Sequence, residues 1–205
     1  MNFSYNDFSQ ILNSFSKGEF IIVFDEDREV EGDFFVLAEN ITPKKINFLL
    51  EHGRGMICTA CDGVLLDRLK LPLMVENNEN PHGTNFCISV DAKEGVTTGV
   101  SAFDRAKTIS VLANPLSTKS DLVIPGHSFP LRAEQDTEKR FGHTEAAVLL
   151  AQKTHKIPAV VICEIINKEG HKATIREVKV LAEKFNMPMT NLKILKKELT
   201  PRIQI

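Results

Sequence analysis

The chain has 205 residues and a formal net charge of −2 at pH 7, from 25 basic and 27 acidic side chains. This length suits one domain or two small ones, and a near-neutral charge argues against the broad basic surface that nucleic acid or an anionic membrane requires. With 42% hydrophobic and 25% charged residues, the composition is that of a globular protein. We find no run of apolar residues long enough to span a bilayer and no signal-like N-terminus, so we expect a cytoplasmic protein without a membrane or nucleic-acid partner.

Apolar spacing predicts a helix and then a strand at the beginning of the chain. Residues 8, 11, 12 and 15 have the i, i+3, i+4, i+7 spacing of an amphipathic helix, and Gly18 provides its stop. The continuous apolar run at 20–24 is typical of a strand buried on both faces. The further elements that we expect are strands at 34–37, 56–59, 86–90, 122–124, 159–166 and 192–194, and helices at 43–53, 62–69, 102–113, 144–154 and 175–185.

Local end signals support two of these helices. Thr42 is a good N-cap with Pro43 at the first helical position, and Gly53 ends the helix. Ser101 and Asp104 have the spacing of a capping box. Strands and helices alternate from end to end without a repeat or a long linker, so we expect a single α/β (α+β) domain over 1–205. The expected architecture is a three-layer sandwich, a mixed sheet with helices on both faces.

An unusually acidic segment follows the first strand. It contains six carboxylates in nine residues: Asp25, Glu26, Asp27, Glu29, Glu31 and Asp33. A solvated acidic turn is one interpretation, and a cation site is the other. A calcium-binding EF-hand loop does not fit, because it would need glycine where Val30 stands and a carboxylate where Val36 stands. Since the segment leaves a buried strand directly, we expect some of its carboxylates to face inward.

A second candidate feature is the start of the helix after Arg140. Gly142, His143 and Thr144 would offer unpaired N–H groups and a hydroxyl beside a guanidinium, which together can bind a phosphate. Thr144 could instead be an ordinary cap. His143 could be a ligand or a structural hydrogen-bonding residue.

Glu164 interrupts the most apolar strand of the chain. An unpaired carboxylate there would cost several kcal/mol. A buried acid in a strand is therefore a candidate general base with a raised pKa.

The four cysteines do not form a recognisable zinc motif. Cys58 and Cys61 make one C-x-x-C pair, which is at most half of a zinc ribbon, and Cys87 and Cys163 stand alone. We therefore expect reduced thiols, of which two are in the core.

Four long motifs in order carry a resemblance to a known family. They are FDEDREVEGD at 24–33, EGVTTGVSAFDR at 94–105, PGH at 125–127 and RFGHTEA at 140–146, with LPLMVENN at 71–78 as a further match. The chain resembles 3,4-dihydroxy-2-butanone 4-phosphate synthase of riboflavin biosynthesis from about Phe20 to Met187. Its length is similar to that of the monofunctional form, without a GTP cyclohydrolase II domain.

The resemblance implies a lyase that converts D-ribulose 5-phosphate to L-3,4-dihydroxy-2-butanone 4-phosphate and formate. The implied path removes the C3 proton to give a metal-bound enediol, loses water from C1, moves C4 in a skeletal rearrangement and releases C4 as formate. Mg²⁺ or Mn²⁺ is the implied cofactor, with two ions per site. The family is homodimeric, with active sites close to the subunit contact.

The resemblance also implies roles for individual residues. Glu29 and His143 are the implied metal ligands, and His127 and Glu164 the implied acid and base groups. Cys58 matches a cysteine near the pocket, with a core thiol as the alternative. The implied substrate contacts are Arg28, Glu29, Asp33, Arg140, Phe141, Gly142, His143, Thr144 and Glu164, of which Arg140, Gly142 and Thr144 surround the phosphate.

One position departs from the family pattern. Relatives commonly carry another acid where this chain has Phe24, so either the metal shell lacks a supporting carboxylate or Phe24 simply completes the strand.

Three other function classes can be compared with this assignment. A metal-dependent sugar-phosphate isomerase or aldolase would share the metal and the phosphate site but would release no formate. A non-catalytic binding module would have no need for Glu164 in a strand or for His127 after Pro-Gly. GTP cyclohydrolase II would need a three-cysteine zinc site, which the sequence does not match.

Overall fold

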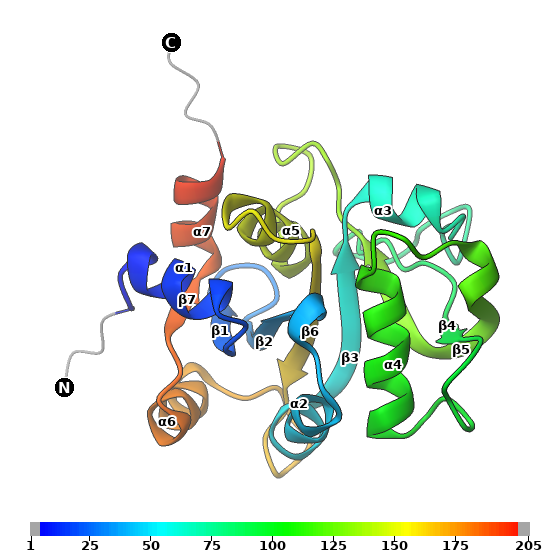
Figure 1. The fold of residues 1–205 in the computed structure, drawn as a ribbon. Helices are drawn as coiled ribbons and strands as arrows, with labels where there is room; N and C mark the ends of the chain where they lie inside the picture. Colours follow the sequence, from blue (N-terminus) through cyan, green and yellow to red (C-terminus); the bar gives the residue numbers. More distant parts are fainter. Residues whose placement is uncertain (1–4, 201–205) are drawn as a thin grey trace.

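A seven-stranded mixed sheet organises residues 5–200, the part of the chain that the computed structural model describes (Figure 1). Its strand order is β4-β5-β3-β6-β2-β1-β7. The strands are β1 Ile21–Asp25, β2 Glu31–Leu37, β3 Arg54–Cys61, β4 Val90–Ala92, β5 Leu122–Arg132, β6 Ala159–Ile165 and β7 Met189–Asn191. Neighbours pair antiparallel except β3 with β5 and β1 with β7, which are parallel.

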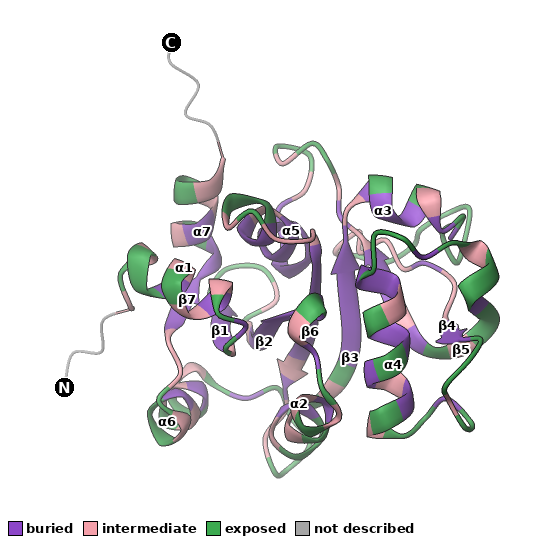
Figure 2. Cartoon of the chain, viewed as in Figure 1, coloured by how far each residue is buried: buried purple, intermediate pink, exposed green. Residues whose placement is uncertain are grey.

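Helices cover both faces of this sheet, as the sequence predicts. The helices are α1 Phe8–Ser16, α2 Pro43–Phe48, α3 Gly63–Arg68, α4 Ala102–Ala113, α5 His143–Lys153, α6 Ile175–Phe185 and α7 Leu192–Leu199. Buried residues of α2, α3, α4 and α6 form one core with one face of the sheet, and those of α1, α5 and α7 form a second core with the other (Figure 2). The architecture is therefore a three-layer α/β sandwich with an apolar core on each side.

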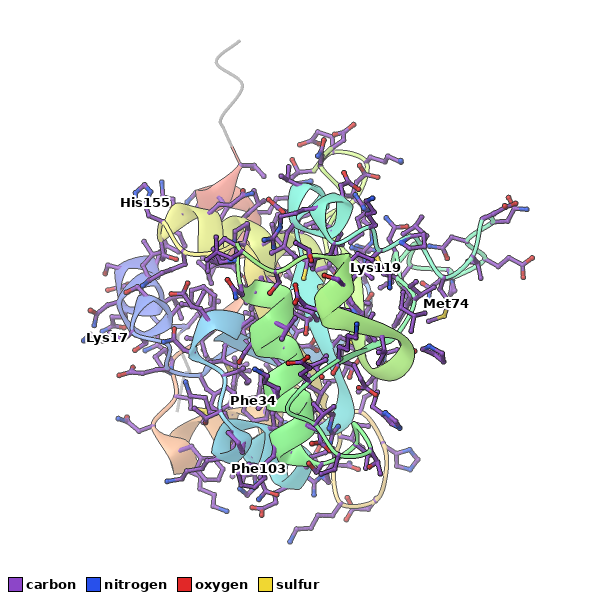
Figure 3. The ribbon with its side chains drawn as sticks, turned by 45° about the vertical axis from the view of Figure 1, so that its right-hand side comes forward. Lys17, Phe34, Met74, Phe103, Lys119 and His155 are labelled. Atoms are coloured by element: carbon purple, nitrogen blue, oxygen red, sulfur yellow. The ribbon has the colours of Figure 1, made fainter. Side chains whose placement is uncertain are left out.

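Two aromatic side chains illustrate the two environments. Phe34 is fully buried in the core under α2, whereas Phe103 near the start of α4 is 74% exposed (Figure 3). Phe24 is also buried, beside Gly32 of the adjacent strand. Phe24 therefore completes the strand, and its side chain belongs to the core on the α6 side of the sheet.

The C-terminal strand prediction at 192–194 is wrong. These residues begin helix α7, and the strand lies just before them at Met189–Asn191. The reason is the side chain of Asn191, which accepts the N–H of Ile194 at 2.8 Å and caps the helix. Leu192 and Leu195 then share one buried helical face.

The predicted strands at 86–90 and 122–124 have different bounds in the structure. Phe86 and Cys87 form only isolated bridges, and the paired strand β4 begins at Val90. β5 continues through Pro125-Gly126-His127 to Arg132, because its first part pairs with β4 and its second part with β3. Ser101 caps α4 as predicted, but Asp104 turns away from the predicted box and accepts hydrogen bonds from Thr97 and Gly99.

All four cysteines are free and buried, whereas the sequence predicted only two of them in the core. Cys58 and Cys61 lie three residues apart on β3 and point into opposite cores. They therefore cannot bind one zinc ion together. Within residues 5–200, no helix has both the length and the apolar character needed to cross a bilayer.

Candidate active site

The acidic loop after β1 is organised by the buried carboxylate of Asp25. Its Oδ1 accepts the N–H groups of Asp27 and Arg28 at 3.1 and 3.2 Å, and its Oδ2 accepts the N–H of Glu29 at 3.0 Å. Burial raises the pKa of Asp25, but these hydrogen bonds outweigh it and leave the pKa below its usual value. The backbone that carries Arg28 and Glu29 is thus held from within the protein.

Val30 occupies a strained position in this loop. Its φ of 49° lies in the left-handed region, which a β-branched side chain rarely adopts. The strain falls between Glu29 and Glu31, so the surrounding contacts, and not the preference of Val30, set the path between these two acids.

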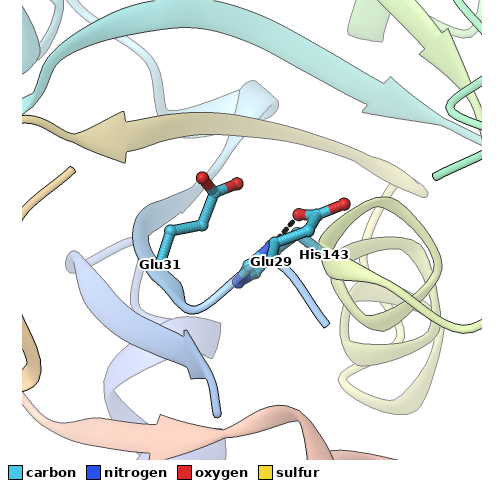
Figure 4. Close-up of side chains that lie close together, drawn as sticks. All are labelled: Glu29, Glu31 and His143. Atoms are coloured by element: carbon cyan, nitrogen blue, oxygen red, sulfur yellow. Dashed lines mark ion pairs between the residues drawn. The ribbon is translucent and has the colours of Figure 1, made fainter. Parts of the chain in front are cut away.

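Glu29, Glu31 and His143 form a compact cluster (Figure 4). One potential ligand atom of each lies within 4.8 Å of those of the other two. His143 is buried at the first position of α5, with Nδ1 3.4 Å from Oε2 of Glu29 and 4.0 Å from Oδ1 of Asp33. Asp33 is buried on β2, two residues after Glu31, and therefore faces the same side of the sheet.

The cluster holds more negative charge than its one imidazole can balance. The hydrogen bond from His143 lowers the pKa of Glu29 to about 2. Burial and the neighbouring Glu29 raise the pKa of Glu31 to about 7, and burial raises that of Asp33 well above its usual value. Burial lowers the pKa of His143, but the carboxylates of Asp33, Glu29 and Glu31 outweigh it and raise the pKa to about 9.

Glu164 lies on β6 directly opposite Asp33 of β2. Its Oε2 accepts the N–H of Met56 at 2.7 Å, at a point where β3 has an irregular register. Gly55 makes this possible, because a Cβ there would lie 2.6 Å from that oxygen. Burial raises the pKa of Glu164 and outweighs the effect of the Met56 N–H. The carboxyl group thus has the raised pKa that the sequence predicts for it.

A buried ion pair fixes the start of α5. The guanidinium of Arg140 contacts the carboxylate of Glu145 closely, and their side chains are 9% and 0% exposed. Oε2 of Glu145 also accepts the N–H of Gly142 at 2.9 Å. The predicted free N–H at Gly142 is therefore wrong, because Glu145 already uses it. The N–H groups of His143 and Thr144 in the first turn of α5 are further donors that can face an anion.

Two arginines converge on one backbone carbonyl. Arg28 Nη2 and Arg140 Nε donate to the carbonyl of His82 at 3.2 and 3.1 Å. Arg28 Nη1 also donates to the carbonyl of Phe141 at 3.0 Å, and Arg140 Nη2 to Oγ1 of Thr84 at 3.0 Å. The polar loop around His82 is thereby held against the helix start.

Comparison with known proteins identifies the family. The sequence profile of the 3,4-dihydroxy-2-butanone 4-phosphate synthase family matches residues 9–198. The chain belongs to this family. It is 43% identical over 186 residues to 3,4-dihydroxy-2-butanone 4-phosphate synthase of Agrobacterium fabrum, covering 90% of this chain and 87% of that protein.

Two further relatives extend the comparison. The Neisseria meningitidis serogroup A protein of the same name is 46% identical over 180 residues, which are 87% of this chain and 50% of that protein. The chain therefore spans about half the length of that relative. A crystal structure of 3,4-dihydroxy-2-butanone 4-phosphate synthase in complex with two magnesium ions matches with a TM-score of 0.87 and 33% identity, covering 95% of this chain and 96% of that one.

The structure brings most of the residues expected for a 3,4-dihydroxy-2-butanone 4-phosphate synthase into one cavity of about 240 Å³. It is lined by the predicted Glu29, Asp33, Cys58, Arg140, His143, Thr144 and Glu164. Arg28 and Phe141 line a neighbouring cavity that shares Arg140. Gly142 lies close to both arginines, since a Cβ on it would be 3.4 Å from the guanidinium of Arg140 and 3.5 Å from that of Arg28. His127 lines neither cavity.

Sequence reasoning missed several residues of this cavity. Glu31, Asn80, His82, Thr84 and Lys172 also line it. Glu31 was detectable, since it alternates with Glu29 and Asp33 and such residues share one face of a strand. Lys172 approaches Oε2 of Glu31 to 3.5 Å and donates to the carbonyl of Glu29. Nothing in the polar segment around Lys172 pointed to this contact.

The residues present suit a divalent cation. Within residues 5–200, Nε2 of His143 and Oδ1 of Asp33 are buried without a hydrogen-bond partner. His143 belongs to the cluster with Glu29 and Glu31, and Oδ1 of Asp33 lies 4.0 Å from its Nδ1. Carboxylate oxygens with one imidazole are a ligand set that accepts Mg²⁺ and Mn²⁺. Burial and, to a smaller extent, repulsion by neighbouring carboxylates raise the pKa values of Glu31 and Asp33, and a cation would offset that repulsion.

Proposed function

We propose that this chain converts D-ribulose 5-phosphate to L-3,4-dihydroxy-2-butanone 4-phosphate and formate, as a divalent-metal-dependent lyase of riboflavin biosynthesis. The observation that carries the proposal is one cavity with an acidic, imidazole-containing cluster and with Arg140 and Thr144. We further propose that residues 1–205 act as one synthase domain. Because its substrate is a charged sugar phosphate that membranes retain, we place the reaction in the cytoplasm.

The charges of the cavity favour one orientation of the substrate. The acidic cluster would repel a phosphate, whereas Arg140, Thr144 and the start of α5 attract one. The phosphate end therefore lies at Arg140 and Thr144, and the sugar oxygens lie toward Glu29 and His143. Arg28 bonds to the carbonyls of Phe141 and His82, and we assign it to the same end.

We propose two Mg²⁺ or Mn²⁺ ions, held by Glu29 and His143 with Glu31 as an additional ligand. When bound, such ions supply positive charge to the sugar oxygens on which negative charge develops. Asp33, Glu29 and His143 orient the sugar beside Glu164. Glu164, as a carboxylate of raised pKa, removes the C3 proton, and an enediol results.

The remaining steps balance without a further reactant. Water lost from C1 is returned when C4 leaves as formate, so the carbon skeleton is shortened without net use of water. These steps need a second proton-transfer group. His127 is the residue that we assign to that role.

A homodimer would explain how His127 can act in the reaction although it does not line the cavity of its own chain. The ring lies on β5, two strands away from Glu164 on β6, and outside the cavity of its own chain. Exposed apolar side chains flank it, with Val100, Val123 and Ile124 at 56%, 42% and 38% exposure. Such side chains are typical of a surface that another protein covers. We propose that a second copy of the chain covers them and receives His127 into its site.

Release of formate from ribulose 5-phosphate tests the reaction. The wild-type protein with Mg²⁺ should release formate, EDTA should abolish the release, and added Mg²⁺ should restore it. Glu164→Gln should be inactive, whereas Glu169→Gln, which changes an exposed acid in the loop after the same strand, should match wild type. Formate from the Glu164→Gln protein would rule out Glu164 as the base, and no formate from wild type would rule out the reaction.

Mixed dimers test the shared site. His127→Ala and Glu164→Gln subunits, unfolded together and refolded, should recover about a quarter of wild-type activity, because half of the dimers are mixed and each has one intact site. Each variant refolded alone should stay inactive. If the mixture also stays inactive while gel filtration shows a dimer, both residues act within one chain and the shared site is wrong.

A further inference from the structure

Both carboxylate oxygens of Asp91 contact His127. Its Oδ1 accepts the backbone N–H of His127 at 2.9 Å, and its Oδ2 lies 2.8 Å from the ring Nδ1 of the same residue. The side chain of Asp91 is 9% exposed, whereas that of His127 is 47% exposed. The pair lies where β4 meets β5, at the edge of the sheet (Figure 1). One buried carboxylate thus holds both the main chain and the ring of His127.

Next to this pair, the backbone of β5 approaches that of β4 closely. The register of β4 and β5 shifts between Val90 and Asp91, so the segment at Gly126 bulges toward β4. A Cβ on Gly126 would lie 2.0 Å from the backbone of Val90. Only glycine permits so close an approach of two backbones.

A second segment covers the pair from the other side. Gly99 has a φ of 96°, and a Cβ there would lie 2.1 Å from Oδ2 of Asp91 and 2.6 Å from Nδ1 of His127. The carboxylate of Asp104 accepts the N–H of Gly99 at 3.1 Å and thereby fixes this segment. The Nδ1 side of the His127 ring is therefore enclosed by Asp91 and Gly99, although the side chain as a whole is 47% exposed.

We infer that Asp91 is a positioning residue that fixes the ring orientation and the tautomer of His127. An ionised carboxylate can only accept hydrogen bonds, so Nδ1 carries the proton and Nε2 presents a lone pair. Nε2 is then the atom that takes and returns a proton. The use of that proton rests on the proposed function, whereas the tautomer does not.

The tautomer can be measured in the wild-type protein without any reaction. Long-range ¹H–¹⁵N spectra of the neutral imidazole distinguish a protonated Nδ1 from a protonated Nε2, and comparison with His127→Ala assigns the signal among the six histidines. We expect the Nδ1–H form for His127. An Nε2–H form in the folded wild-type protein would overturn the inference.

Asp91→Asn provides the kinetic test. In this variant the amide oxygen of Asn can still accept the backbone N–H of His127, and the amide NH₂ group then lies beside Nδ1. Because an NH₂ group can only donate, Nδ1 must accept the hydrogen bond, and the ring proton moves to Nε2. We expect the Nε2–H signal and a kcat for formate release that is about 10- to 100-fold lower, with KM for ribulose 5-phosphate within about two-fold of wild type.

Ser89→Ala is the matched control. It removes the hydrogen bond from the N–H of Gly126 to Oγ of Ser89 in the same bulge and leaves the ring contact intact. Its kcat should stay within about two-fold of wild type. A folded Asp91→Asn protein with wild-type tautomer or wild-type kcat overturns the inference. If wild type releases no formate, the proposed function fails, and the tautomer alone decides the role of Asp91.

Discussion

The Nδ1 atom of His143 lies 3.4 Å from Oε2 of Glu29, which joins the start of α5 to the loop after β1. This contact is the centre of the acidic cluster. The imidazole stabilises the ionised form of Glu29, but it leaves the charge of Glu31 and Asp33 to be offset by another cation. Lys172 supplies a second positive charge 3.5 Å from Glu31, yet the pKa values of Glu31 and Asp33 stay raised, so the cluster still favours a further cation.

Glu31→Gln should weaken metal binding, because it removes one of the three clustered ligands. We expect Mn²⁺ affinity to fall about 10-fold or more, measured by electron paramagnetic resonance of free Mn²⁺ during titration. Asp27→Asn is the control. It neutralises an exposed acid of the same loop that pairs with Lys193, and it should change the affinity less than about two-fold. Equal losses in both variants would mean that overall loop charge, and not ligation, attracts the ion.

Glu145→Gln should destabilise the fold strongly, because it leaves the guanidinium of Arg140 buried without its counter-charge. Loss of one partner of a buried ion pair costs about 3–5 kcal/mol, which urea unfolding would measure. Lys139→Ala removes an ion pair with Glu134 in which the lysine is exposed, and its urea midpoint should stay close to that of wild type. Similar midpoints for the two variants would contradict a stabilising role for the buried pair.

Periodic and local signals in the sequence predicted most of the sheet and the helices around it. The apolar runs at 20–24 and 159–166 are long enough to identify buried strands, and Thr42 and Ser101 mark helix starts through hydrogen bonds to residues three positions away. His143 was placed at the start of the helix predicted at 144–154, and it is the first residue of α5 in the structure. These features depend on near neighbours in the chain, which is why one sequence reveals them.

Features set by distant partners were not predictable. β7 has three residues and exists because it pairs with β1, so the apolar residues after it were taken as the strand. Lys172 reaches the acidic cluster from a loop that is remote in sequence. The contact of Asp91 with His127 depends on the register shift between β4 and β5, which no local pattern encodes.

Val30→Gly should stabilise the protein, because glycine adopts a positive φ without steric cost. Relief of about 1–2 kcal/mol of strain is partly offset by about 0.5–1 kcal/mol of added backbone entropy in the unfolded chain. We expect a net gain of up to about 1 kcal/mol in urea unfolding. Val180→Gly, at an exposed position inside α6, should instead destabilise by about 0.5 kcal/mol. Destabilisation by both changes would show that Val30 is not strained.

Asp104 should make the stability of the protein depend on pH, because its carboxylate holds the segment from Thr97 to Gly99 that covers Asp91 and His127. Its carboxylate accepts the N–H and hydroxyl of Thr97 at 2.9 and 2.7 Å, as well as the N–H of Gly99. These hydrogen bonds lower its pKa from 3.8 to about 2. A group whose pKa falls on folding stabilises the protein above its unfolded-state pKa, and this contribution disappears as the pH drops from about 4 toward 2.

Asp104→Asn should therefore lower the urea midpoint at pH 7, and the deficit relative to wild type should shrink at pH 3. Asp7→Asn is the control, since Asp7 precedes α1 without a side-chain cap hydrogen bond, and its midpoint should follow wild type at both pH values. A deficit of the same size at pH 7 and pH 3 would show that the charge of Asp104 does not stabilise the segment. The hydrogen bonds of Asp104 would then stabilise the segment regardless of its charge, and the enclosure of Asp91 would not require an ionised Asp104.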